Sequence, residues 1–157
     1  ISLQFYYNSS YKDRNYGYGL GFSMGEEMRY ALSLSGDSVT IERGDGRSDL
    51  YLKKDQGYEA PTGVFDRLTQ QGEGQFVLTM KDGTIYRFEN AKHKRVTKIE
   101  NRSGLVTTLQ YQPDGLLTGV SDNAGRSLAL TYTDGLLKRP ARLSKERFPI
   151  NMIAGSV

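Results

Sequence analysis

Apolar residues recur at every second position in short runs along the chain, and this alternation predicts β-strands rather than helices. Leu105, Thr107, Leu109 and Tyr111 show it most clearly, because an extended strand would place all four on one face. Further strands are predicted at residues 3–7, 28–34, 38–42, 49–53 and 75–80. The expected fold class is therefore all-β.

Pairs of Asp and Gly separate many of these runs and predict tight hairpin turns, since Gly adopts positive φ without a steric cost. The stretch 56–74 lacks alternation and is rich in Gly and Gln, so we predict a loop there with one helical turn at 64–69. The turn pairs are Gly36-Asp37, Asp45-Gly46, Asp82-Gly83, Asp114-Gly115 and Asp134-Gly135.

An internal repeat underlies the second half of the chain. Gly83, Gly104 and Gly125 follow one another at a spacing of 21 residues, and Tyr111 aligns with Tyr132 at the same spacing, after which the third copy lacks one residue before its Asp-Gly. Each copy holds two strand-like runs joined by a turn, which makes it about one β-hairpin. A lone hairpin buries too little surface to be stable, so the copies are expected to stack into an antiparallel sheet.

These patterns divide the chain into three expected parts. Residues 1–82 form a β domain before the repeats, residues 83–137 hold the repeats, and residues 138–157 form an irregular tail without alternation or Gly spacing. A frameshift or an artificial boundary is one explanation of the tail, and an authentic flexible segment is the other. We favour the first, because the pattern breaks inside a repeat.

Composition leaves little room for catalysis. The 157 residues include 18 Gly and 11 Tyr but no Cys, which excludes disulfides and thiolate metal sites. The one histidine, His93, lies in a lysine-rich loop, and carboxylate pairs such as Glu26-Glu27 have turn residues as neighbours. We therefore expect neither an enzyme nor a bound cofactor.

The charge pattern argues against nucleic acid as a partner. Residues 138–147 carry five Lys or Arg and one Glu, a balance of +4, so the net charge of +3 leaves −1 for the rest of the chain. A phosphate-binding surface would need clustered basic residues on the folded part. No apolar run approaches the roughly 18 residues needed to span a bilayer, so no membrane insertion is expected.

Two copies carry a family resemblance. The segments Tyr111-Gln-Pro-Asp-Gly-Leu-Leu and Tyr132-Thr-Asp-Gly-Leu-Leu resemble the YD repeats of bacterial Rhs proteins and eukaryotic teneurins. The segment LQFYYNSSYKDRNYGYGLGFSM resembles the opening of the domain that precedes those repeats, with Phe22 where Trp is usual. The resemblance covers residues 3–137. The self-cleaving core motif that ends many Rhs shells is absent.

The resemblance implies a structural role in a secreted or cell-surface bacterial protein. Similar proteins wind YD hairpins into a shell that encloses or displays a C-terminal toxin or effector domain, so the expected partners are the rest of that shell and its effector. A fragment of such a sheet would expose unpaired edge strands, and we expect self-association through residues 75–80 or 128–132.

The alternative is a carbohydrate-binding or adhesive surface module. Exposed aromatic rings can stack on sugars, and the candidate contacts are Tyr6, Tyr7, Tyr11, Tyr16 and Tyr18. Packing of these rings on the Gly-rich turn and neighbouring strands is the explanation that we favour. The triplet Arg43-Gly44-Asp45 spells an integrin-binding motif, which we interpret as a coincidence at a hairpin turn.

Overall fold

The structure, a computed structural model, describes residues 3–7, 9, 12, 13, 22–134, 136, 137, 141, 142 and 150–154. Its regular elements are β-strands apart from short 3₁₀ turns such as η2 (Glu26–Met28), which confirms the all-β prediction. The chain divides into two units, residues 26–106 and residues 1–25 with 107–157. The boundaries predicted at residues 82 and 137 stay predictions.

The first sheet of the 26–106 unit is antiparallel, in the order β3-β4-β5-β6. Gly36, with φ of 56°, occupies the first central position of the two-residue turn between β3 and β4. The predicted strands at 38–42 and 49–53 are confirmed, whereas the one predicted at 28–34 begins only at Ala31, after η2. The four strands are β3 (Ala31–Ser35), β4 (Ser38–Glu42), β5 (Ser48–Lys54) and β6 (Gly57–Glu59).

A second antiparallel set in the same unit runs in the order β10-β9-β8-β7. Its strands are β7 (Arg67–Gly72), β8 (Gln75–Thr79), β9 (Ile85–Phe88) and β10 (Lys98–Glu100). The predicted loop at 56–74 is therefore wrong, since β6 and β7 lie within it. Leu68 is the single buried side chain of β7, so pairing with β8 forms this strand without a hydrophobic pattern of its own.

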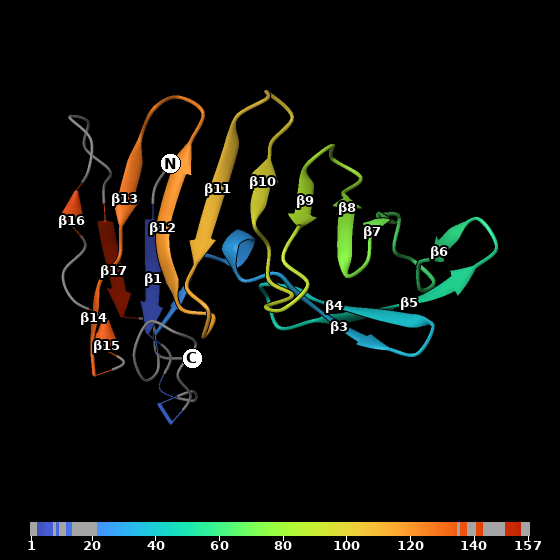
Figure 1. Cartoon of the computed structure of the whole chain (residues 1–157), viewed down its shortest axis with the longest axis horizontal. Helices are drawn as coiled ribbons and strands as arrows, with labels where there is room; N and C mark the ends of the chain where they lie inside the picture. Colours follow the sequence, from blue (N-terminus) through green and yellow to red (C-terminus); the bar gives the residue numbers. More distant parts are fainter. Residues whose placement is uncertain are drawn as a thin grey trace. The chain divides into compact units, whose positions relative to one another are not determined.

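The core of this unit lies between its two sheets, which cross at a large angle in Figure 1. Alternation along each strand directs one set of side chains inward, as the sequence predicts. Tyr30 stacks on Tyr86 at 4.2 Å between ring centroids, and Tyr58 meets Phe76 edge-on at 5.8 Å. The buried strand residues are Leu32, Val39, Ile41 and Tyr51 from the first sheet, and Leu68, Phe76, Leu78, Tyr86, Phe88 and Ile99 from the second.

In the other unit the predicted repeat hairpin forms as expected. β11 (Val106–Tyr111) pairs antiparallel with β12 (Leu117–Asp122), which pairs with β13 (Ser127–Ala129). Leu109, Val120 and Leu128 lie side by side in this register and are all buried. A short hairpin of β14 (Tyr132–Thr133) and β15 (Leu136–Leu137) follows, with Asp134 at φ of 52° in its turn.

Two strands form in the tail that was predicted to be irregular. β16 (Ala141–Arg142) pairs with β13, and β17 (Ile150–Ala154) lies parallel to β1 (Leu3–Tyr7). β1 also pairs with β2 (Phe22–Met24). Backbone pairing with strands made elsewhere in the chain, rather than the repeat pattern, accounts for these elements. The parallel pair is an exception to the antiparallel arrangement that the repeats predict.

Candidate functional site

Five hairpin turns share one backbone geometry. In each, the N–H of the first residue donates to the carbonyl of the fifth, and the fourth residue, a glycine, donates to the carbonyl of the first. The glycine φ values lie between 81° and 91°, a left-handed region that a side chain would strain. A type I turn followed by a left-handed residue has this form. The five glycines are Gly46, Gly83, Gly104, Gly115 and Gly125.

Side chains complete these turns in two ways. The Oδ1 atoms of Asn101 and Asp122, which the repeat alignment matches, each accept two backbone N–H groups of their own turn. In the other three turns, the Asp before the glycine accepts the N–H two residues further on. That bond, from the Thr84 N–H, holds the pKa of Asp82 below its usual value. The repeat aspartates therefore stabilise turns.

The tyrosine of the repeat also makes a backbone contact. The hydroxyl of Tyr132 donates to the carbonyl of Leu117 at 2.6 Å, and its ring is half-buried. Leu117 begins β12, so this bond fastens the start of one repeat strand to the chain that follows β13. The tyrosine thus joins β14 to the start of β12.

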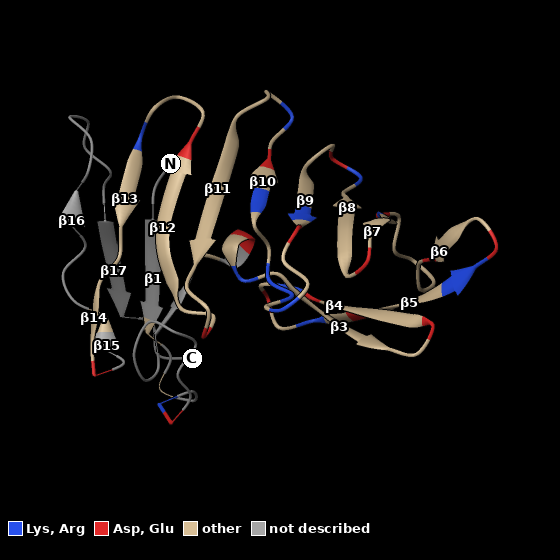
Figure 2. Cartoon of the chain, viewed as in Figure 1, with Lys and Arg blue, Asp and Glu red and all other residues tan. Residues whose placement is uncertain are grey.

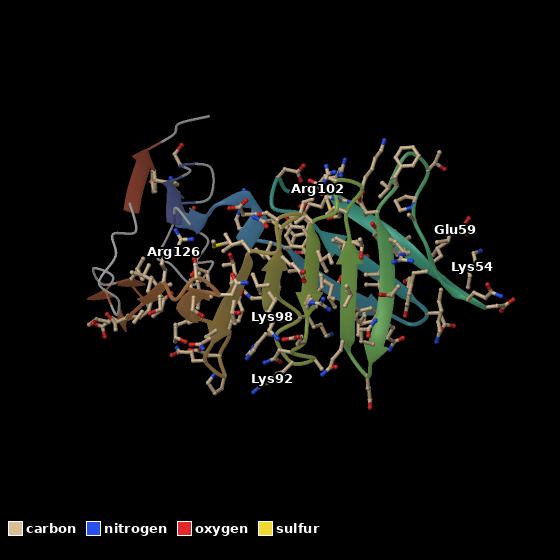
Figure 3. All side chains as sticks on the ribbon, turned by 90° about the horizontal axis from the view of Figure 1, so that it is seen from above. Lys54, Glu59, Lys92, Lys98, Arg102 and Arg126 are labelled. Atoms are coloured by element: carbon tan, nitrogen blue, oxygen red, sulfur yellow. The ribbon has the colours of Figure 1, made fainter. Side chains whose placement is uncertain are left out.

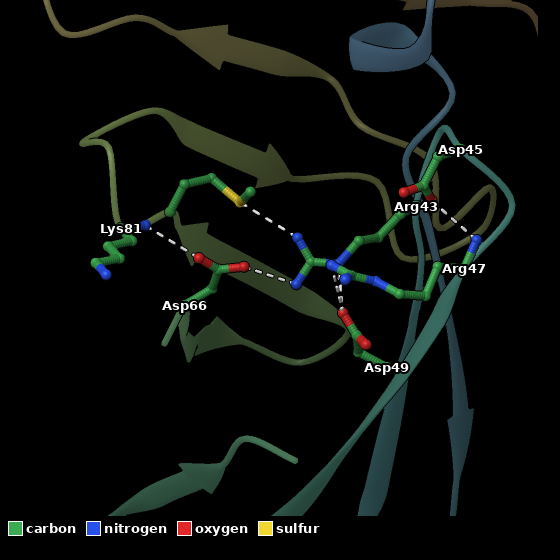
Figure 4. Close-up of polar contacts among 7 residues, drawn as sticks. Arg43, Asp45, Arg47, Asp49, Asp66 and Lys81 are labelled. Carbon is green, nitrogen blue, oxygen red and sulfur yellow. Dashed lines mark hydrogen bonds and ion pairs between the residues drawn. The ribbon is translucent and has the colours of Figure 1, made fainter. Parts of the chain in front are cut away.

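A buried ion cluster joins the two sheets of the 26–106 unit (Figure 4). The guanidinium of Arg43 donates to the carboxylate of Asp49 through Nε and to that of Asp66 through Nη2, the latter at 2.6 Å. Its Nη1 lies 3.7 Å from the sulfur of Met80, and the other oxygen of Asp66 accepts the N–H of Lys81 at 3.0 Å. Asp49 lies in β5 of the first sheet and Arg43 directly follows β4, whereas Asp66 and Met80 flank the second sheet.

Burial sets the electrostatics of this cluster. The Arg43 side chain is 3% exposed, which rules out its use in an integrin-binding triplet. Burial acts to lower the pKa of Arg43, but hydrogen bonds to Asp66 and Asp49 outweigh it and raise the pKa above its ordinary value. Burial also raises the pKa of the neighbouring Tyr51 to about 12. The cluster therefore braces the unit.

One segment of the folded part is rich in basic residues. Residues 87–102 hold six Lys or Arg and two Glu. Arg87 and Lys98 face each other across β9 and β10, yet each pairs with a glutamate, Glu100 at 3.5 Å and Glu89 at 2.9 Å. Figure 2 shows the alternation of sign on these strands. These ion pairs offset the like-charge repulsion.

Two of the remaining cations of this segment lie far from each other. Lys92 lies in the loop before β10 and Arg102 in the turn after it, on opposite sides of the unit in Figure 3. The absence of nucleic-acid binding stays a prediction. Among the described residues, no three His, Cys, Asp or Glu side chains are placed to share a metal ion, and no helix is long and apolar enough to cross a membrane.

The tyrosines proposed to contact carbohydrate fall mostly outside the described residues. Tyr11, Tyr16 and Tyr18 lie outside them, and Tyr6 is described only by its backbone in β1. Tyr7 is half-buried and makes a contact of its own. The glycan site therefore stays a prediction. His93 is half-buried in the β9–β10 loop, where its backbone N–H donates to Asn90 Oδ1 at 3.2 Å.

The strands predicted at residues 75–80 and 128–132 are not unpaired edge strands. β8, at residues 75–79, pairs with β7 on one side and β9 on the other. β13 pairs with β12 and, through Leu128 and Ala129, with β16. The prediction failed because it took the strongest strand patterns as edges and did not detect β7 and β16, which pair with them.

Sequence reasoning also missed the exposed apolar side chains. Leu50 and Leu52 project from the outer face of β5 with 49% and 46% of their surface exposed, and Phe65 is 74% exposed. The ammonium of Lys81 lies 4.8 Å from the centre of the Phe65 ring. Alternation around Tyr51 could have indicated that both leucines face away from the core.

Comparison with known proteins places the repeat region in a family. Residues 90–127 match the family model described as RHS Repeat. No curated protein matches the chain. The match contains the turns of Gly104, Gly115 and Gly125 and all of β10, β11 and β12, so the family signature coincides with the hairpins described above.

Proposed function

We propose that the chain, whose residues 90–127 match the RHS Repeat family, is a non-catalytic part of a β-sheet shell that encloses or displays a C-terminal toxin or effector domain. The observation that carries the proposal is the match at residues 90–127 to a structural repeat, over strands that form the expected hairpin. The rest of the shell and the effector would be its partners, in a secreted or cell-surface bacterial protein.

The geometry of the hairpins supports a role in the continuous sheet of a shell. Every residue type that marks the repeat serves the sheet: glycine bends each turn, Asn101 and Asp122 cap turns, and Tyr132 bonds to the start of β12. One face of β11, β12 and β13 buries Leu109, Val120 and Leu128 in a continuous row. A row of this kind extends without limit as hairpins are added, because each hairpin covers its neighbour.

The first experiment is to sequence the coding DNA on both sides of this segment and translate all frames. If the chain is part of a shell wall, Gly-spaced YD repeats continue downstream near residue 137, in this frame or another. A stop codon after Val157 with no repeats beyond it would contradict the shell and would move the carbohydrate-binding alternative to first place.

Protease protection of the full-length product tests enclosure directly. The downstream domain should resist cleavage in the intact protein and become cleavable when Val120→Asp disrupts the buried row. Ser121→Asp, at a half-buried position on the same strand that lies outside that row, is the matched control. Equal cleavage of the downstream domain in the wild type, Val120→Asp and Ser121→Asp would contradict the enclosing role.

A further inference from the structure

The strand β7 ends its sheet, and the chain before it belongs to the other sheet of the same unit. β7 is the last strand in the order β10-β9-β8-β7, and β6 pairs with β5. Residues 60–66 carry the chain from one sheet to the other. An end strand of this kind presents unpaired N–H and C=O groups, which invite pairing with another strand unless the edge is blocked.

A β-bulge interrupts this edge. The register between β7 and β8 shifts between Gln70 and Gly72, so Gln71 has no partner on β8. The side chain of Gln70 fixes the bulge, because its Nε2 donates to the Gly72 carbonyl at 3.2 Å and its Oε1 accepts the Tyr58 hydroxyl at 3.2 Å. A bulge increases the local twist and breaks the even spacing of outward-facing backbone groups.

The other end of β7 is held by the buried ion cluster. Asp66 precedes the strand, and its carboxylate binds Arg43 and the N–H of Lys81. Only Arg67, Leu68, Thr69 and Gln70 remain as regular strand, and the side chain of Arg67 is exposed. A regular edge this short, with a charge at its end, offers few bonds to an incoming strand.

We propose that β7 is a closed edge, so that no second copy of the chain pairs at this strand. The inference goes beyond the proposed function, because it rests only on the bulge, the short regular segment and the charged end of β7. It replaces the self-association expected at residues 75–80. Blocked edges of this type keep sheet proteins from pairing with one another.

The test removes, in the full chain, the features that block pairing at β7. A variant with an unblocked edge, called the opened variant, combines Arg67→Thr, Gln70→Val and deletion of Gln71. These changes remove the charge, the hydrogen bonds of the Gln70 side chain and the bulge. The control combines Thr40→Val and Glu42→Thr on β4, which makes similar exchanges in a strand paired on both sides. Mass by light scattering is measured across a wide range of protein concentration.

Cysteine crosslinking locates the contact. The chain has no cysteine, so Thr69→Cys introduces a single thiol in the middle of the regular part of β7. We expect the wild-type background and the control to stay uncrosslinked under a mild oxidant at β7, whereas the opened variant forms a disulfide-linked dimer. Crosslinking of the chain that carries Thr69→Cys alone would overturn the proposal, as would an opened variant that folds and gives no dimer.

Hydrogen exchange on the wild-type protein decides the question if the opened variant fails to fold. The outward-facing amides of residues 67–71 should exchange at a rate independent of protein concentration, because no second copy of the chain pairs with them. Protection that grows with concentration would overturn the closed edge. Neither readout depends on sequence outside the chain, so failure of the shell proposal and failure of the closed edge are distinguishable.

Discussion

Glycine is required at the tight turns of this protein for two separable reasons, backbone conformation and space. Gly36 and Gly74 both lie in short turns with positive φ, 56° and 66°. A Cβ at Gly36 would meet nothing within 4 Å, whereas one at Gly74 would lie 2.6 Å from the Cβ of Ala91. The pair therefore separates backbone strain from steric exclusion.

Gly74→Ala should lower the free energy of unfolding by about 2–4 kcal/mol, the sum of left-handed strain and overpacking against Ala91. Gly36→Ala should cost about 1 kcal/mol from strain alone. Denaturant unfolding of both variants checks the difference. Equal costs would show that the β9–β10 loop moves aside at no cost.

Asp122 links turn stability to pH. Burial acts to raise the pKa of its carboxyl, but the backbone N–H and the guanidinium of Arg126 outweigh burial and hold the pKa below its ordinary value of 3.8. A carboxyl with a depressed folded-state pKa contributes stability above its unfolded-state pKa and loses it as pH falls through the folded-state value. The contribution should be complete at pH 7.

Asp122→Asn should therefore lower the melting temperature by a few degrees at pH 7, with the gap to wild type closing in strong acid. The turn itself should survive, because Asn101 makes the equivalent backbone hydrogen bonds in the preceding copy. Thermal unfolding from pH 7 down to pH 2 provides the measurement. A gap that stays constant with pH would mean that the charge of Asp122 contributes nothing.

At the scale of elements, the Arg43 cluster fastens β4 and β5 to the start of β7. Arg43→Met should destabilise the 26–106 unit by about 3–5 kcal/mol, because two buried carboxylates would lose their counter-charge. Arg47→Ala should cost no more than about 1 kcal/mol, since that side chain is 57% exposed and lies 3.5 Å from Asp49. Chemical unfolding compares the two, and similar losses would contradict a bracing role for Arg43.

The elements that sequence patterns predict best are those whose own residues determine them. The prediction matches β4 to the residue and β8 within one, because alternation and flanking turn pairs lie inside the segment. It misses β6, which has only three residues, and β7, which has a single buried leucine, because neither segment shows an alternating hydrophobic pattern. Pairing with the neighbouring strands determines both.

The ion cluster was hidden for a related reason. Asp66 lies 23 residues from Arg43 and Met80 lies 37, so no local spacing joins them. One signal was available: Arg43 follows Val39 and Ile41 at two-residue intervals and therefore shares their inward face. The sequence analysis instead interpreted Arg43 as part of a hairpin turn, because it belongs to the Arg43-Gly44-Asp45 triplet.

At the scale of the whole molecule, the carbohydrate-binding alternative remains open to experiment. Tyr16→Ala with Tyr18→Ala should leave glycan retention unchanged and lower the melting temperature if these rings pack, the outcome that we expect. Retention on a glycan array and thermal unfolding are measured on the same preparation, with Tyr58→Phe as a control that keeps its ring. Lost retention at an unchanged melting temperature would instead establish a binding surface.

The strand order has a consequence for biosynthesis. β7, β8, β9 and β10 are neighbours in the sheet in the order in which they are translated, and the same holds for β11, β12 and β13. Such low contact order means that each new strand finds its partner already made as it leaves the ribosome. Among the strands that the structure describes, β1 and β17, which pair from Leu3 with Ile150 onward, are the ones whose pairing must wait for nearly the whole chain. A sheet of this type grows with its own synthesis, and few strands are left waiting for a distant partner.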